Sequence, residues 1–296
     1  MAVVEVNPTS TARAIGSRRR RASRTFAIGA GLLLVITLAC FLWPPLSGVS
    51  TTDFVGTPLQ APSVQHPFGT DNFGRDVFVR TMAGGRLDLV VAALGVTVPL
   101  IFGTFLGVVS GLAAGTVLDR VIMRIVDAIL AFPFAILILA LSVVIGPDWN
   151  LWVLPAGAPA ILVALFVTSW SVYARIARGE TLSIRQRDFV VAAQVTGLSR
   201  WTVVRRHLLP NVLPATFTYA LSDVVLVIGV IASLPFLGAG VQPPTPEWGS
   251  IIYDGRSLLG QAPWVSLCPG LVVVATGIAV RLMGQGSRIL SGGEDA

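Results

Sequence analysis

The stretch Asp188-Phe-Val-Val-Ala-Ala-Gln-Val-Thr-Gly197 lies in a basic, helix-prone segment between two long apolar runs. Alanine favours a helix, and Gly197 is placed to end it, because glycine readily takes the left-handed conformation found at helix C-termini. Ser199 can then cap a second helix running from Arg200 to Leu208. Two short helices joined by a glycine turn, with arginines around small side chains, predict a docking surface for a protein partner.

The composition outside this segment is typical of an integral membrane protein. Of the 296 residues 54% are hydrophobic and only 12% are charged, and the mean hydropathy is +0.78. Soluble domains carry about 25% charged residues, roughly twice this fraction. The chain therefore has room for several membrane spans but not for a large soluble domain.

All 21 basic residues other than histidine are arginine. A P-loop needs a lysine against the nucleotide phosphates, so we expect no standard ATP site and no catalytic centre in this chain. Cys40 and Cys268 lie in apolar runs and are expected to be small buried side chains without a disulfide. The two histidines, His66 and His207, are far apart in the sequence, which argues against a histidine-based metal site. We therefore expect neither a metal nor a cofactor.

A helix needs about 20 apolar residues to cross the hydrocarbon core of a bilayer. We expect an all-α integral membrane protein with six transmembrane helices. They lie at residues 26–43, 89–113, 125–145, 158–177, 215–238 and 263–283. The first run resembles a signal peptide, but its apolar character continues past Cys40 and favours an uncleaved anchor. Pro210 and Pro214 are expected to stop the preceding helix before the fifth span begins.

The arginines predict how the chain lies in the membrane. With the N-terminus in the cytoplasm, seventeen arginines fall in inner segments and four, at 75, 80, 86 and 256, in outer ones. Arginine is enriched on the cytoplasmic side of membrane proteins, so both termini are expected there. The expected organisation is a basic tail at 1–25, an anchor at 26–43, an external segment with an interfacial helix at 44–88, a five-helix core at 89–288 that includes the docking loop at 178–214, and a second tail at 289–296.

Glycines inside the second span predict how it packs. Gly103, Gly107, Gly111 and Gly115 recur at every fourth position. This spacing places them on one face of the helix and lets the backbone of another helix approach closely.

Two outer segments carry distinctive motifs. In the first, from His66 to Arg80, Thr70-Asp71 can cap a short interfacial helix that braces the second span. The alternative is direct contact with a partner that delivers substrate. The second, Gln242-Pro-Pro-Thr-Pro-Glu-Trp-Gly249, is expected to be stiff and extended. Its Trp248 suits the membrane interface, and the alternative is a place at the external mouth of a transport pathway.

Together these motifs carry a resemblance to a known family. Val191-Ala192-Ala193, Gly197 and Leu209-Pro210 resemble the "EAA" loop of ABC importer permeases. The outer motifs narrow the resemblance to the C-type permeases of dipeptide, oligopeptide and nickel importers. The outer residues that carry it are Gly69, Asp71, Gly74, Arg75, Asp76 and Arg80, together with the run from Gly238 to Gly249. The similarity extends in order from about residue 66 to residue 288.

The resemblance implies a type I ABC importer permease fold that supplies one half of a transmembrane pathway in a bacterial cell membrane. It implies as partners a B-type permease subunit, two ABC ATPase subunits or domains that bind ATP and Mg, and an extracytoplasmic substrate-binding protein. The residues implied in contact with the ATPase are Asp188, Ala192, Ala193, Gly197 and Arg200. Those implied at the pathway mouth are Pro243, Pro244, Trp248 and Gly249.

Some residues depart from the family pattern. Val191 replaces the glutamate of the family loop, so a salt bridge made by that glutamate would be absent. Gln194 and Pro235 also differ from the pattern.

Peptides are the favoured cargo, because the spans show no charge cluster that would select a metal ion, with nickel, glutathione or another small solute as alternatives. A secondary transporter that uses Asp223 is a distant alternative. Arginines just inside a membrane are expected from topology alone, so we expect no nucleic-acid partner.

Overall fold

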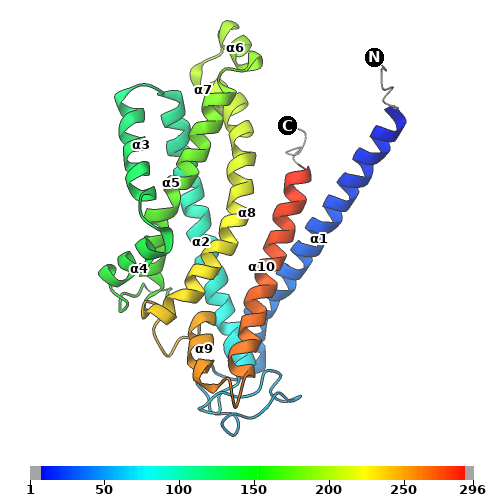
Figure 1. Cartoon of the computed structure of the whole chain (residues 1–296), viewed down its shortest axis with the longest axis vertical. Coiled ribbons are helices and arrows are strands. Elements are labelled where there is room, and N and C mark those ends of the chain that lie inside the picture. The colour runs from blue at the N-terminus through cyan, green and yellow to red at the C-terminus, as the bar shows by residue number, and fades with distance from the viewer. Residues whose placement is uncertain (1–7, 152, 291–296) are drawn as a thin grey trace.

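The computed structural model describes residues 8–151 and 153–290, which form a bundle of helices (Figure 1). The long helices are α1 (Pro8–Ser47), α2 (Val77–Leu112), α3 (Val117–Leu130), α4 (Phe134–Ile145), α5 (Ala158–Ile184), α8 (Leu209–Ser233) and α10 (Trp264–Leu290). The short ones are α6 (Asp188–Val195), α7 (Arg200–Val203) and α9 (Trp248–Gly255). A π-helical turn, η1 (Val204–Leu208), and two 3-10 turns, η2 (Leu234–Leu237) and η3 (Arg256–Leu258), complete the described elements.

Within the described residues, five helices are long and apolar enough to cross a membrane, and α3 with α4 brings the number to as many as six. The expected third span at 125–145 is wrong as a single helix, because α3 and α4 meet at 90°. Pro133 lies at the break, where it lacks a backbone N–H and disfavours a helical conformation in the residue before it.

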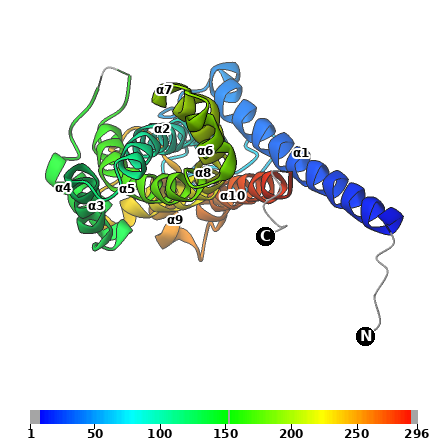
Figure 2. The same cartoon turned by 90° about the horizontal axis from the view of Figure 1, so that it is seen from above.

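The two ends of the bundle carry different features (Figure 1). The start of α1 and the end of α10 lie at the same end as α6 and α7, which we call the α6 end. The opposite end, the α9 end, carries α9 and the loop of residues 48–76. Seen from above, α3 and α4 lie on one side of α2, α5 and α8, and α1 leaves on the other (Figure 2).

The glycine row packs α2 against α5, which confirms the close helix contact predicted from the sequence. A Cβ atom added at Gly107 would lie 2.7 Å from the Cβ of Ala177, and one at Gly111 would lie 2.7 Å from the Cβ of Thr181. Gly103 meets the same helix one turn away, at Tyr173. Gly115 differs, because it lies beyond α2 in a turn, with φ of 85° and open space around it.

The contact between α8 and α10 is looser. A Cβ added at Gly277 would lie 3.7 Å from the Cγ1 of Val225, and one at Gly284 would lie 3.7 Å from the Cβ of Leu221. These are ordinary van der Waals separations. The contact of α8 with α10 can therefore accommodate an added methyl group at these glycines, whereas the contact of α2 with α5 cannot.

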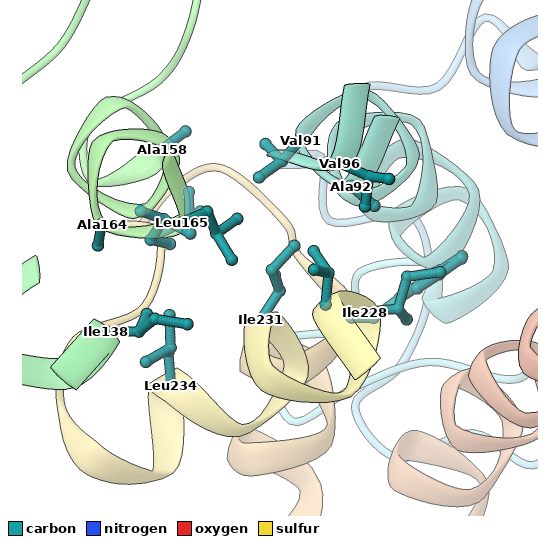
Figure 3. Close-up of a cluster of buried hydrophobic side chains, with 14 of the residues drawn as sticks. Val91, Ala92, Val96, Ile138, Ala158, Ala164, Leu165, Ile228, Ile231 and Leu234 are labelled. Carbon is teal, nitrogen blue, oxygen red and sulfur yellow. The ribbon is translucent and has the colours of Figure 1, made fainter. Parts of the chain in front are cut away.

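The largest apolar core joins α2, α5 and α8 (Figure 3). Its labelled side chains come from those helices, from α4 and from η2: Val91, Ala92, Val96, Ile138, Ala158, Ala164, Leu165, Ile228, Ile231 and Leu234. This core fixes the central helices relative to one another and so positions the loops at both ends.

The second and fifth spans begin differently from the expectation. No separate interfacial helix forms after Thr70-Asp71, because Asp76 caps α2 instead and accepts a hydrogen bond from the N–H of Val79 at 2.9 Å. Residues 77–88 are therefore the first turns of the second span. Pro210 and Pro214 do not end the helix as expected, because the helix runs continuously through η1 into α8. The π-helical turn η1 lies just before Pro210, at the point where the proline removes one backbone hydrogen bond from the helix.

Candidate functional site

The segment from Arg185 to Leu208, which we call the α6–α7 loop, stands out at the α6 end (Figure 1). Gly197 has φ of 80°, the left-handed conformation predicted for it at the turn between the two helices. The Ser199 hydroxyl accepts a hydrogen bond from the N–H of Thr202 at 3.2 Å and caps α7. The predicted pair of short helices with a glycine turn is therefore confirmed as local structure.

A buried apolar cluster fixes this loop to the bundle. Its members are Val108, Ala177, Ile184, Val190, Ala193, Val203, Leu208 and Val212. Ala193, one of the residues expected to touch an ATPase, is only 7% exposed and packs in this cluster. The reason is helical periodicity: Val190 and Ala193 are three residues apart and share the inward face of α6.

The outer surface of the same loop is unusually apolar. Val195 is 82% exposed and Trp201 is 71% exposed, and three further large apolar side chains are also exposed: Phe189, Val191 and Leu198. Asp188, Ala192, Gly197 and Arg200 are exposed beside them. Large apolar side chains that are exposed within one short segment favour contact with a partner. We call these five large apolar residues the apolar face of the loop.

The sequence analysis identified the small residues of this loop but overlooked its large apolar ones. The signal was available, because Phe189 and Trp201 are bulky side chains in a segment otherwise rich in arginine. A hollow of about 1010 Å³ opens between the last turn of α2 and α7. Arg185 and Arg200 line it together with the apolar side chains of Leu198 and Val203.

An ion pair joins α5 to α3 below the loop. Arg178 donates from Nε to Asp119 Oδ1 at 2.7 Å and from Nη2 to Oδ2 at 2.9 Å. Ser110 of α2 and the N–H of Gly115 also donate to this carboxylate, at 2.6 and 3.0 Å. Arg185 adds a bond to the carbonyl oxygen of Gly111 at 2.9 Å. These contacts connect the base of the loop to α2 and α3.

At the α9 end, Asp71 is the centre of a second network. Its Oδ1 accepts from the N–H groups of Phe73 and Arg75, and its Oδ2 accepts from Nε of Arg75 at 2.7 Å. Nε of Arg80 lies 3.7 Å away. Asp71 and Arg80 are both buried, so this is a buried network of paired charges that joins the loop of residues 48–76 to the start of α2.

The other outer motif residues shape the same loop. Asp76 Oδ2 lies 2.8 Å from Nδ1 of His66 while its Oδ1 caps α2. Gly69 and Gly74 have φ of 70° and 77°, a conformation that side chains other than glycine adopt at a cost. A Cβ at Gly69 would also collide with the indole of Trp264. The structure thus assembles all six outer motif residues in one region.

Two of the four residues predicted at the pathway mouth line a hollow at the α9 end. Pro243 and Pro244 line a hollow of about 460 Å³ that they share with Arg75, Arg80 and Asp254. Burial raises the pKa of Asp254 above its ordinary value, although the nearby arginines oppose that rise. This hollow brings two outer motifs, far apart in the sequence, to one place.

Trp248 and Gly249 do not line that hollow, and both are buried. Trp248 is 0% exposed, and its indole N–H donates to the carbonyl oxygen of Thr81 at 2.9 Å. Gly249 is buried against the backbone of Ala232. The indole binds inside the protein rather than at the membrane interface because α2 offers it a buried acceptor.

Comparisons with known proteins agree with this architecture. Residues 103–285 match the family model described as the binding-protein-dependent transport system inner membrane component. The chain is 36% identical over 230 residues to the dipeptide transport system permease protein DppC of Alkalihalophilus pseudofirmus, covering 78% of this chain and 72% of that protein. It is 35% identical over 278 residues to a putative peptide transport system permease protein of Brucella suis, covering 92% and 88%.

A third relative and one solved structure are also similar to this chain. The glutathione transport system permease protein GsiD of Pectobacterium atrosepticum is 33% identical over 274 residues, covering 91% of this chain and 87% of that protein. A crystal structure of an amino acid ABC transporter with histidines has a TM-score of 0.54 at 14% identity, covering 71% of this chain and 93% of the other, and supports the fold alone. The chain is a multi-pass membrane permease without catalytic activity of its own. It belongs to the inner-membrane components of binding-protein-dependent ABC importers.

Proposed function

We propose that this chain is one of two permease subunits that form the pathway of an ATP-driven importer of short peptides. The similarity to permeases named for dipeptide, peptide and glutathione transport, over as much as 92% of the chain, carries this proposal. Glutathione is itself a small peptide, so the three names share one substrate chemistry. A B-type permease would supply the other half of the pathway.

The α6–α7 loop is the part that we assign to the ATPase. Its apolar face offers a surface to a partner, and burial of each large apolar side chain contributes roughly 1.5–3 kcal/mol. Val191 stands on this face, so contact there is apolar rather than ionic. Two ATPase subunits or domains would bind ATP and Mg and transmit their closure through this loop.

The arginines support the assignment of the α6 end to the cytoplasm. Arg120, Arg124 and the seven arginines between residues 175 and 206 lie in segments at or near this end, whereas Arg75, Arg80 and Arg256 lie toward the α9 end. This asymmetry follows the positive-inside rule. With the α6 end inside, both termini are cytoplasmic, and the hollow at Pro243 and Pro244 faces the substrate-binding protein.

The test is affinity purification of the chain from its native membranes in mild detergent, followed by mass spectrometry and reconstitution. Recovery of a second permease and ATPases, with uptake of short peptides that requires ATP and a binding protein, is the expected result. A chain that arrives alone and transports without ATP would instead indicate a secondary transporter. In this structure the Asp223 carboxylate accepts a hydrogen bond from the Tyr173 hydroxyl at 2.8 Å.

A further inference from the structure

Two buried carboxyl groups meet where α9 lies against α2. Glu247 is 0% exposed and caps α9, accepting hydrogen bonds from the N–H groups of Gly249 at 2.7 Å and Ser250 at 2.8 Å. Asp88 of α2 is 2% exposed, and its Oδ2 accepts from the N–H of Trp248 at 3.0 Å. The two acids therefore bind successive N–H groups at one helix terminus.

One oxygen of this pair has no partner. Asp88 Oδ1 is buried and makes no hydrogen bond to any of the described residues. Burying an ionised carboxylate without a partner is costly, and a second buried carboxylate beside it adds repulsion. A proton on the pair removes one negative charge and turns one acceptor oxygen into a donor.

The surroundings supply no compensating positive charge. Among the described residues, no arginine or histidine lies within 4.0 Å of either acid. From α1, the thiol of Cys40 faces Gly85, one turn before Asp88. From α8, the backbone of Ala232 closes the site against Gly249. Cys40 is thus the one further titratable group that faces the pair from these helices.

The backbones of the two helices also meet tightly here. A Cβ added at Gly84 would lie 3.1 Å from the Cα of Glu247, and one at Gly85 would lie 2.5 Å from the Trp248 ring. Any repulsion between the carboxyl groups therefore acts directly on the contact between α2 and α9. We propose that protonation of this buried pair of acids, Asp88 and Glu247, forms a proton-dependent latch that holds α9 against α2.

The latch has a definite dependence on pH. Burial raises the pKa of Glu247 from 4.5 to about 7, while its two backbone hydrogen bonds oppose that rise. Because this pKa is higher in the folded chain than in the unfolded one, the stabilisation is complete below about pH 4.5 and is lost as the pH rises towards about 7. Tyr253 and Asp254 of α9 line the hollow at Pro243, so loosening α9 changes the shape of that hollow.

The test compares thermal unfolding of the purified full chain in detergent with that of Asp88→Asn, from about pH 5 to about pH 8. The asparagine amide supplies a donor that does not titrate. The melting temperature of the wild type is expected to fall by several degrees more than that of the variant. Asp53→Asn removes an exposed acid, outside the latch, and should keep the wild-type dependence on pH. Glu247→Gln, which keeps one acceptor oxygen, is the second variant should Asp88→Asn fail to fold.

A local measurement separates the latch from global titration. Hydrogen exchange of the α9 amides, corrected for the intrinsic effect of pH, should lose about tenfold in protection in the wild type and little in Asp88→Asn. Equal dependence on pH in both proteins, or α9 protection in the wild type that does not change, would overturn the proposal. Neither measurement involves transport, so such a result leaves the proposed function untouched.

Discussion

Arg178 donates two hydrogen bonds to Asp119, of 2.7 and 2.9 Å, and so connects α5 to α3 immediately below the α6–α7 loop. The Asp119 side chain is buried, whereas that of Arg178 is partly open to solvent. Since α5 leads directly into the loop, this pair sets how firmly the loop is held by the rest of the bundle.

Replacing this arginine should destabilise the protein measurably. Arg178→Leu leaves the buried Asp119 carboxylate with only Ser110 and a backbone N–H, at an expected cost of about 2–3 kcal/mol after allowance for the solvent exposure of Arg178. Thermal unfolding in detergent measures it. The control is Arg175→Leu, whose ion pair with Asp127 is exposed and is expected to contribute less than about 1 kcal/mol. Similar losses in both variants would contradict the assignment.

A charge on the apolar face of the α6–α7 loop should block coupling. Val195→Asp and Trp201→Asp are each expected to reduce ATP-driven uptake by at least about tenfold, because an interface must then bury an unpaired carboxylate. Membrane insertion and thermal stability should stay near those of the wild type. Val64→Asp is the control, because Val64 is fully exposed but lies at the α9 end. Uptake at wild-type levels in both loop variants would exclude this face as the ATPase contact.

The turn at Gly197 should tolerate some side chains better than others. Its φ of 80° is accessible to asparagine but strained for a β-branched residue, and among the described residues beyond its chain neighbours no atom lies within 4 Å of the position of its Cβ. We expect Gly197→Asn to keep most uptake and Gly197→Val to lose most of it. Equal uptake by these two variants would show that the backbone conformation of the turn does not matter for coupling.

Glycines in the two helix contacts should respond in opposite ways to alanine. Gly107→Ala forces α2 away from α5 and is expected to cost about 1–3 kcal/mol by overpacking. Gly277→Ala finds ordinary contact distances and should cost less than about 0.5 kcal/mol. Unfolding of the two variants in the same detergent gives the comparison. A larger loss for Gly277→Ala would reverse the order of tightness that we assign to the two contacts.

Removal of the Asp71 carboxylate should loosen the loop of residues 48–76. Asp71→Asn leaves Arg75 and the buried Arg80 without their shared partner, at an expected cost of about 3 kcal/mol. Limited proteolysis from the α9 side should then cut this loop faster than in the wild type. Asp53→Asn, at an exposed position in the same loop, should not change the rate.

The sequence predicted the features that depend on near neighbours in the chain. Gly197 and Ser199 predict the turn and the cap between α6 and α7. The four-residue spacing of Gly107 and Gly111 predicts a close helix contact. Apolar composition alone located most of the spans, because the bilayer fixes the length of a membrane helix.

Features that depend on distant residues were not visible in the same way. Arg178 and Asp119 are 59 positions apart, and Trp248 finds the carbonyl of Thr81 across 167 positions. Nothing in the local pattern around Trp248 distinguishes a buried indole from one at the membrane interface. The break at Pro133 was missed because its flanking residues are apolar enough to be read as one span. The roles of the loop residues in coupling remain predictions.

The helix from Arg200 to Leu237 passes through η1 and η2 without a gap. At 1.5 Å per residue its 38 residues make a rod roughly 55 Å long. One end carries the exposed Trp201, and the other reaches Pro235 in the wall of the hollow that Pro243 and Pro244 also line. Trp201 at one end and Pro235 at the other are therefore joined by one continuous helical backbone, with no loop between them.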